Sequence, residues 1–416
     1  MHLESNQLNN SFCNKKFFNV SIAVFIIALI GHRVLIGALN YLTLGYTGYT
    51  PILLYAATLA MVIAMVINSS SLKLSFKNII PAILLMYLVI VITLHQLTSA
   101  LGEGQVVVQT ISYIVIPLSL ILFSYKINSE CIFTEIIKYS RIVILIAAAI
   151  TVYALFEYIE HFGAMGANQQ IFRDRFSIVH TLEQLASEES STNAILEGRL
   201  FGFLAILSLV AFYNYSIMKW ILFFLFLFII EVIGNRQSFY GVFLVMPLLL
   251  LLNARPSRYL TLLFTYYNLI FLLVVLVLSF VSFESRLANV QNESRINLIK
   301  DALSSLDKVN FFGNGPFYFS NNISWHYPHN ITIELLFEYG YVAAIFYWAL
   351  IFSFFGRVAF SFLNRSIDKL DILLISLALY GLFIAHISGT ISLNLITLSF
   401  LALYFSLSSI KKSIIT

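Results

Sequence analysis

Long apolar runs recur along this chain from one end to the other. A helix needs about 20 apolar residues to cross a hydrocarbon core about 30 Å thick, so a chain of 416 residues with few long polar gaps has room for about twelve crossings. Hydrophobic residues make up 60% of the sequence and charged residues only 11%, whereas charged residues are about 25% of a typical soluble protein. We therefore predict an all-α polytopic integral membrane protein.

The predicted spans are taken from the apolar runs alone. They cover residues 17–38, 50–68, 78–98, 106–124, 141–159, 198–216, 218–235, 238–252, 259–282, 331–353, 371–388 and 390–409. The first run is too long for the core of a signal peptide, so we expect it to remain as an uncleaved helix. Two long polar segments then divide the chain into five regions. These are N-terminal helices in 1–159, a first outer loop in 160–197, central helices in 198–282, a second outer loop in 283–330 and C-terminal helices in 331–416.

Basic residues near the helix ends predict the orientation, because lysine and arginine are retained in the cytoplasm during insertion. Alternate loops carry most of them, and both termini fall in this basic set. Its members are Lys15, Lys16, Lys73, Lys77, Lys126, Lys138, Arg141, Lys219, Arg255, Arg258, Arg357, Arg365, Lys369, Lys411 and Lys412. We therefore expect cytoplasmic termini, and the two long polar loops on the outer face.

Arginine is the main cation of the opposite, outer set of loops. The candidates for ligand contact there are Arg173, Arg175, Arg199, Arg236, Arg286 and Arg295. A planar guanidinium grips phosphate oxygens through two parallel hydrogen bonds. A single arginine can equally rest at the interface by snorkelling, but several together favour an anionic ligand. Glu231 is expected either to be a buried partner for one of these arginines or to face a cavity.

Both outer loops carry helical patterns. In the first, apolar residues recur at helical spacing from Phe172 to Leu182, which predicts an amphipathic helix lying over a cavity or on the membrane surface. In the second, residues 295–309 are predicted to be helical, with Leu306 on the apolar face. Gly313 and Gly315 then predict a tight turn with positive φ, which would return the chain toward the membrane.

His329 immediately precedes Asn330 and the apolar run that begins at Ile331. Asn330 is a credible N-cap for a helix at this position. The positive end of the helix dipole disfavours an imidazolium, so we expect His329 to be neutral and able to accept a proton. A lone histidine can also serve only to hydrogen-bond its loop, and these residues alone leave both interpretations open.

Five motifs in the second half of the chain resemble those of a known family. They are GRLFGF at 198–203, GNRQSFYGVFL at 234–244, SRINLIKDAL at 294–303, GNGPF at 313–317 and HNITIELLFEYG at 329–340. Their order, and the long loop before the last motif, resemble the bacterial O-antigen polymerases and ligases. These are membrane glycosyltransferases that use polyprenyl-pyrophosphate-linked glycans at the periplasmic face. The resemblance covers residues 195–355, and the N-terminal spans match in hydropathy alone.

This resemblance implies a helical scaffold of the GT-C type and a metal-independent, inverting transfer without a cofactor. The catalytic residues expected on this basis are His329, Arg236 and Arg295. The expected substrate contacts are Arg199, Arg286, Asn330, Arg173 and Arg175. The protein would lie in the bacterial inner membrane with its site toward the periplasm, act on a polyprenyl-pyrophosphate-linked oligosaccharide, and work with a co-polymerase that regulates chain length.

Two arginine-bearing outer loops favour a polymerase over a ligase that transfers glycan to the lipid A core. A lipid-glycan flippase or transporter is a further alternative, although transporters usually show repeated halves. A non-catalytic scaffold would not need the arginines and the histidine. The sequence has no P-loop, no dinucleotide motif and no HExxH spacing, and Cys13 and Cys131 form no CxxC pair. We therefore expect no bound metal, no nucleotide-driven transport and no nucleic-acid partner.

Overall fold

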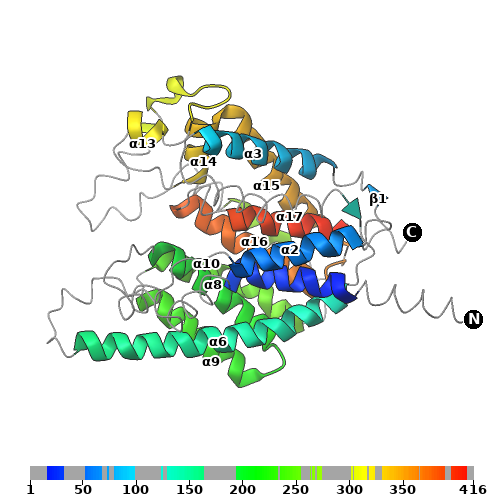
Figure 1. The fold of residues 1–416 in the computed structure, drawn as a ribbon. Helices are drawn as coiled ribbons and strands as arrows, with labels where there is room; N and C mark the ends of the chain where they lie inside the picture. The colour runs from blue at the N-terminus through cyan, green and yellow to red at the C-terminus, as the bar shows by residue number, and fades with distance from the viewer. Residues whose placement is uncertain are drawn as a thin grey trace, which may run out of the picture. The chain divides into compact units, whose positions relative to one another are not determined.

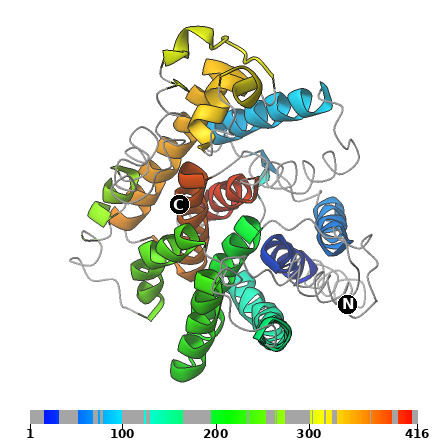
Figure 2. The same ribbon diagram turned by 90° about the vertical axis from the view of Figure 1, so that its left-hand side faces the viewer.

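The computed structural model is almost entirely helical (Figures 1 and 2). The chain divides into two compact units. It describes residues 16–31, 52–67, 73–74, 79–98, 123–124, 129–163, 194–232, 235–253, 263, 265–267, 269–273, 301–302, 304–315, 318–323, 330–364, 366–388 and 395–409. Unit 1 consists of Met1–Ser71 and Lys126–Ala254. Unit 2 consists of Leu72–Tyr125 and Arg255–Thr416.

Unit 1 is organised around one buried helix. Its described helices are Lys16–Gly31, α2 (Ile52–Ile67), α6 (Ser129–Gly163), α8 (Ala194–Ala211), α9 (Ser216–Val232) and α10 (Arg236–Leu250). Helix α8 packs against α6, α9 and α10, and it is buried from Gly198 onward. A helix that is apolar on every side requires neighbours around it, which explains the central position of α8.

A single arginine ties α6 to the end of α8. Arg141 Nε donates a hydrogen bond of 2.8 Å to the carbonyl oxygen of Ala211, the last residue of α8. The last carbonyls of a helix have no partner within it, and this guanidinium supplies one. Arg141 Cζ also lies 5.8 Å from the ring centroid of Phe212 and 5.0 Å from that of Tyr215. These two rings belong to the short turn that leads into α9.

Unit 2 contains the C-terminal helices and a minimal strand pair. Its described elements are β1 (Lys73–Leu74), α3 (Ile79–Thr98), β2 (Phe123–Ser124), the 3-10 turn η8 (Leu306–Lys308), α13 (Tyr318–Asn322), α14 (Ile331–Glu334), the π-helical turn η9 (Leu335–Tyr339), α15 (Gly340–Leu363), α16 (Lys369–Ser388) and α17 (Leu395–Ser409). The strands are antiparallel, with Lys73 opposite Ser124. Helix α15 packs along α3, and α16 packs along α17 (Figure 1).

Short-range polar contacts start α16 and join α15 to α17. Asp371 N donates to Asp368 Oδ1 at 2.9 Å, and Asp368 N donates to Asp371 Oδ2 at 3.1 Å. This reciprocal cap satisfies two main-chain donors at the start of α16.

Arg357 Nη1 of α15 donates to the carbonyl oxygen of Phe405 in α17 at 3.4 Å, and its Cζ lies 5.5 Å from the Phe405 ring centroid.

The part of the second outer loop that the structure describes folds against the start of the following helices. Ala302, Val309, Phe319, Ile333 and Phe337 form one buried apolar cluster, in which the rings of Phe319 and Phe337 meet edge to face at 5.1 Å between centroids. The predicted apolar face was wrong at one position, since Leu306 is 38% exposed. It lies in the 3-10 turn η8, whose tighter winding rotates it away from the face that an α-helix would present.

Three helical stretches in the described part of the chain are long and apolar enough to cross a membrane. They are Ser129–Phe156, Ile331–Leu363 and Lys369–Ile387, and shorter apolar helices accompany them. These lengths and compositions agree with the predicted class, a helical membrane protein. The expectation that Glu231 is a buried partner for an arginine was wrong, because its side chain is exposed near the end of α9. The alternative, that it faces a cavity, stays a prediction.

The Arg141 contact generates a stability prediction. Arg141→Met keeps a long, apolar stem at this position. It removes the donor to Ala211 and the charge over the aromatic rings. We expect the free energy of unfolding in detergent micelles to fall by about 1.5–3 kcal/mol, the usual range for a hydrogen bond to a charged group. Lys138→Met, one turn earlier on the exposed side of α6, should change it by less than about 0.5 kcal/mol. Equal stability of the two variants would contradict the assignment.

Candidate functional site

The predicted site residues differ in how far the structure describes them. Arg173, Arg175, Arg286, Arg295 and His329 lie outside the described residues. Arg236 is described through its backbone only, as the first residue of α10. Arg199 and Asn330 are described in full, in unit 1 and unit 2 respectively. Arg199, Arg236 and Asn330, with the motifs around them, are therefore the described part of the candidate site.

In unit 1, the motifs GRLFGF and GNRQSFYGVFL pack against each other near their starts, at Gly198 and Asn235. A Cβ added to Gly198 would lie 2.5 Å from Asn235 Cβ, so the absence of a side chain at Gly198 lets α8 approach the start of α10. Asn235 Oδ1 accepts from Ser238 N at 3.2 Å and thereby caps α10. Arg199, the next residue along α8, is 4% exposed. A buried guanidinium on an apolar helix is costly and marks a functional site by default.

The start of α10 carries the partial positive charge of a helix N-terminus. Helix α10 is 15 residues long and begins at Arg236. The first main-chain amides of a helix and the positive end of its dipole favour negative charge. Asn235 uses its own side chain on the backbone, so it orients the start of α10. The charge in this pair of motifs comes from Arg199 and Arg236.

In unit 2, Asn330 holds the last motif in place through three hydrogen bonds. Its Oδ1 accepts from Thr332 N at 2.9 Å and from Ile333 N at 3.4 Å, as predicted for an N-cap. Its Nδ2 donates to the carbonyl oxygen of His386 in α16 at 3.2 Å. Asn330 is 2% exposed. Its amide is therefore engaged inside the protein, where it fixes the start of α14 against α16.

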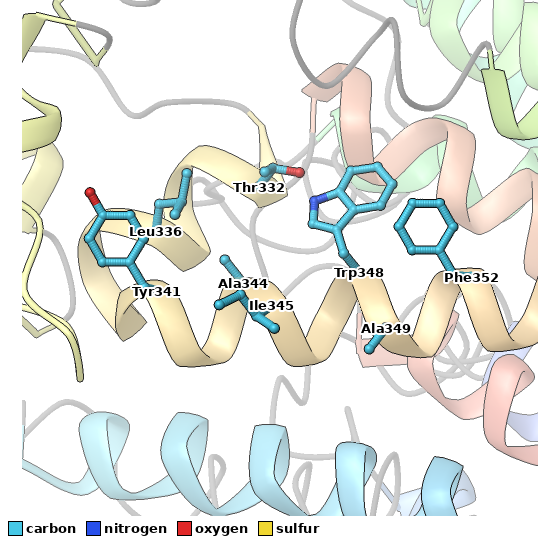
Figure 3. Close-up of a pocket in the computed structure, with 8 residues that line it drawn as sticks. All are labelled: Thr332, Leu336, Tyr341, Ala344, Ile345, Trp348, Ala349 and Phe352. Atoms are coloured by element: carbon cyan, nitrogen blue, oxygen red, sulfur yellow. The ribbon is translucent and has the colours of Figure 1, made fainter.

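The predicted span 331–353 is interrupted, because the chain folds back at Gly340. Gly340 has φ +87°, which an L side chain rarely adopts. Thr332 and Trp348 would lie about 24 Å apart along a continuous helix, yet both line one groove (Figure 3). We call residues 331–339, which comprise α14 and η9, the arm. The arm runs to Gly340, and α15 then runs back beside it, so the predicted span 331–353 is not one continuous helix.

The predicted glycine turn is confirmed, and it binds the end of the arm. Gly313 and Gly315 have φ +93° and +97°. The carbonyl oxygens of Phe337 and Glu338 accept from Asn314 N at 3.2 Å and from Gly315 N at 3.0 Å. A Cβ on Gly340 would overlap the backbone of Gly313, and a Cβ on Gly313 would overlap the backbone of Glu338 and Tyr339. The two motifs therefore touch main chain to main chain.

Three buried ionisable residues were missed by sequence reasoning. Glu334 and Glu338 on the arm are each 2% exposed, and both interact with neighbouring groups. His386 is fully buried, and its Nδ1 lies 2.7 Å from the carbonyl oxygen of Leu382. A carbonyl can only accept, so Nδ1 carries the proton. The available signal was the presence of ionisable residues inside apolar runs, which is rare without a role.

The structure thus brings four of the five motifs together as two pairs, one within each unit. GRLFGF packs against GNRQSFYGVFL, and GNGPF packs against HNITIELLFEYG. The fifth, SRINLIKDAL, lies mostly outside the described residues, and the convergence of all five stays a prediction. No protein-family model, curated protein or solved structure matches the chain.

The contact between Gly313 and Gly340 predicts how alanine substitutions change the free energy of unfolding. Gly340→Ala and Gly313→Ala each combine a positive φ with overlap against main chain, so we expect each to lower the free energy of unfolding by more than about 2 kcal/mol. Gly356→Ala on α15 is the matched control, because an added Cβ there meets nothing within 4 Å. It should be neutral or stabilising by up to about 1 kcal/mol. Thermal unfolding in detergent would measure all three, and a tolerated Gly340→Ala would refute the docking contact.

Proposed function

We propose that this chain is a surface-polysaccharide polymerase, a glycosyltransferase of the O-antigen polymerase type. It would transfer a polyprenyl-pyrophosphate-linked glycan onto a polyprenyl-pyrophosphate-linked repeat unit at the periplasmic face of the inner membrane. The observation that carries the proposal is the packing of the resembling motifs into two pairs. Each pair joins two resembling motifs through glycine and asparagine residues of the motifs themselves, which supports a common role.

The proposed reaction is a direct displacement at the anomeric carbon of the donor sugar. The acceptor hydroxyl oxygen forms a bond to C1 while the bond from C1 to the diphosphate oxygen breaks. The leaving diphosphate keeps the bonding electron pair, and His329 takes the hydroxyl proton. Attack opposite the leaving group inverts the configuration at C1. No metal or cofactor enters these steps.

Fixed positive charge would lower the barrier, because negative charge grows on the leaving diphosphate. Arg236 and Arg295 are the proposed clamp. Arg236 is the first residue of α10, where main-chain amides also favour an anion. Arg199 would support the clamp from α8, and Arg286, Arg173 and Arg175 would draw the anionic head group toward the site.

The two asparagines adjacent to the proposed catalytic residues would act by positioning. Asn235 caps α10 directly before Arg236, and Asn330 caps α14 directly after His329. Each amide is bound to backbone atoms. A fixed helix start restricts where the neighbouring functional side chain can go, and catalysis is sensitive to misplacement of about 1 Å.

The finer topology is also proposed. About twelve helices would cross the membrane, with both termini in the cytoplasm. The GNG turn and the arm would then lie on the periplasmic side. A co-polymerase that regulates chain length would be a partner in the membrane.

Complementation of a gene-deletion strain tests the proposed activity. The deletion should leave a single repeat unit on the lipid core, which would be visible on a gel. Arg236→Ala, Arg295→Ala and His329→Ala should each reduce polymer at least about 100-fold while the protein remains folded in the membrane. Lys308→Ala, an exposed cation of the same outer loop, should restore full polymer.

Two outcomes would refute the proposal. Polymer made at the normal level by the arginine variants would remove the diphosphate clamp. Naked lipid core, with accumulated polyprenyl-linked polymer in the deletion strain, would identify a ligase instead.

Cysteine labelling tests the proposed orientation. The chain has only two cysteines, and Cys131 is exposed at the start of α6. A membrane-impermeant maleimide added from the periplasmic side should leave Cys131 unmodified, and it should react once the inner membrane is opened. Lys308→Cys in a cysteine-free background is the opposite control and should react from the periplasm. Reversal of the two labelling patterns would overturn the orientation.

A further inference from the structure

A β-turn in the second outer loop carries two exposed phenylalanines. Gly313 N donates to the carbonyl oxygen of Asn310 at 3.2 Å, which closes a turn with Phe311 and Phe312 at its two central positions. Their side chains are 61% and 66% exposed, and their rings meet edge to face at 4.9 Å between centroids. Glycine, proline and short polar residues dominate such turns. The turn conformation therefore does not account for two aromatic residues at its tip.

The polar side chains of this loop hold the turn in a fixed shape. Asn310 Nδ2 donates to Asn314 Oδ1, and Asn314 Nδ2 donates to the carbonyl oxygen of Lys308 at 3.0 Å. The main-chain amides of Asn314 and Gly315 bind the end of the arm. The two rings are therefore presented on a braced support, and a surface that is ordered in advance loses little conformational entropy when it binds.

The exposed rings adjoin the start of α15. We call Leu306, Phe311 and Phe312 the turn patch, since all three are exposed apolar residues of this loop. Tyr341 Oη donates to the carbonyl oxygen of Leu306 at 3.1 Å. Val342 N donates to the carbonyl oxygen of Phe311 at 3.4 Å. The turn patch is thus attached to the first turn of α15 at two points.

The position of α15 in a bilayer then sets the level of the turn patch. Ile345, Phe352 and Phe360 are exposed, and their spacing places them on one side of the helix. Helix α15 belongs to a stretch that is long and apolar enough to cross a membrane, and an exposed apolar side of such a helix contacts lipid. Its 24 residues extend about 36 Å, whereas the hydrocarbon core is about 30 Å thick. The first turn of α15 would therefore lie at the edge of the core.

We propose that the turn patch inserts into the membrane interface, where acyl chains meet head groups, and that bilayer lipid is the partner of its exposed rings. Interfacial elements bury apolar side chains about 5–10 Å into this layer. The exposed charges of Asp307 and Lys308 would stay among the head groups. Because the loop is hydrogen-bonded to the arm, insertion would fix the height of the arm relative to the bilayer. The inference does not depend on the proposed transferase activity or on the orientation of the chain.

A tryptophan reporter at position 312 tests the depth of the turn patch. The chain has three tryptophans, Trp220, Trp325 and Trp348, and each is replaced by phenylalanine before Phe312→Trp is introduced. In phosphatidylcholine nanodiscs, lipid brominated near the carbonyl end of its acyl chains should quench this reporter at least about twofold more than lipid brominated near the chain ends. Asn321→Trp is the matched control, because Asn321 is an exposed polar residue of α13 in the same loop. Its emission should be quenched by aqueous acrylamide instead.

Spin labelling repeats the measurement without changing the native tryptophans. Phe312→Cys and Asn321→Cys are labelled separately with a nitroxide, in a background that carries Cys13→Ser and Cys131→Ser. Oxygen concentrates in lipid and a nickel chelate stays in water. The label at 312 should therefore collide more often with oxygen, and less often with the chelate, than the label at 321.

Three outcomes would overturn the proposal. A reporter at 312 that behaves like the reporter at 321 would leave the turn patch in water. Stronger quenching by lipid brominated at the chain ends would place it in the hydrocarbon core. Shielding from acrylamide in nanodiscs that hold two copies of the chain, but not in nanodiscs that hold one, would assign the turn patch to contact between copies.

Discussion

The main-chain contact between the glycine turn and Gly340 is the constraint on which the rest of unit 2 depends. A fold-back inside an apolar stretch frees carbonyl groups that no longer have helical partners, and such groups are expensive when they are buried away from water. The amides of Asn314 and Gly315 supply partners for two of them. This requires backbone to approach backbone, which only glycine allows at residues 313 and 340. The outer loop and the arm are therefore one structural element.

The two motif pairs use related devices. In unit 1, Gly198 admits the side chain of Asn235, which caps α10. In unit 2, Asn330 caps α14 and also donates to the backbone of α16. In both cases an asparagine amide is bound to main chain, and the residue beside it in sequence is one of the proposed catalytic groups. A rigid cap restricts the positions that a neighbouring long or titratable side chain can reach.

The sequence was informative where local chemistry decides structure. The positive φ values of Gly313 and Gly315 and the cap at Asn330 follow from intrinsic preferences of these residues, and both were predicted correctly. The fold-back at Gly340 was not predicted, because residues 331–353 read as one apolar run and hydropathy does not record direction. The π-helical turn before Gly340 has no sequence signature of its own. Glu334 and Glu338 were the missed cue, since two acids within that run are difficult to place in an uninterrupted span.

Long-range contacts explain the other failures. Leu306 fits a helical pattern, but it lies in a 3-10 turn whose carbonyl binds Tyr341. Glu231 fits the expectation of a buried acid on an apolar helix, but its side chain is exposed near the end of α9. His386 would have been noticed only by asking why an imidazole lies near the end of an apolar helix. Its main-chain carbonyl oxygen, not its imidazole, accepts the hydrogen bond from Asn330, a residue 56 positions earlier.

The fold-back also sets heights along the bundle. Trp348 is level with His386, since their rings are 5.5 Å apart, and His386 is two residues from the end of α16. The first two turns of α15, from Gly340 to Trp348, span roughly 12 Å along the helix. Asn330, bonded to the main chain of His386, therefore lies near the level of Trp348 and away from the Gly340 end of the arm.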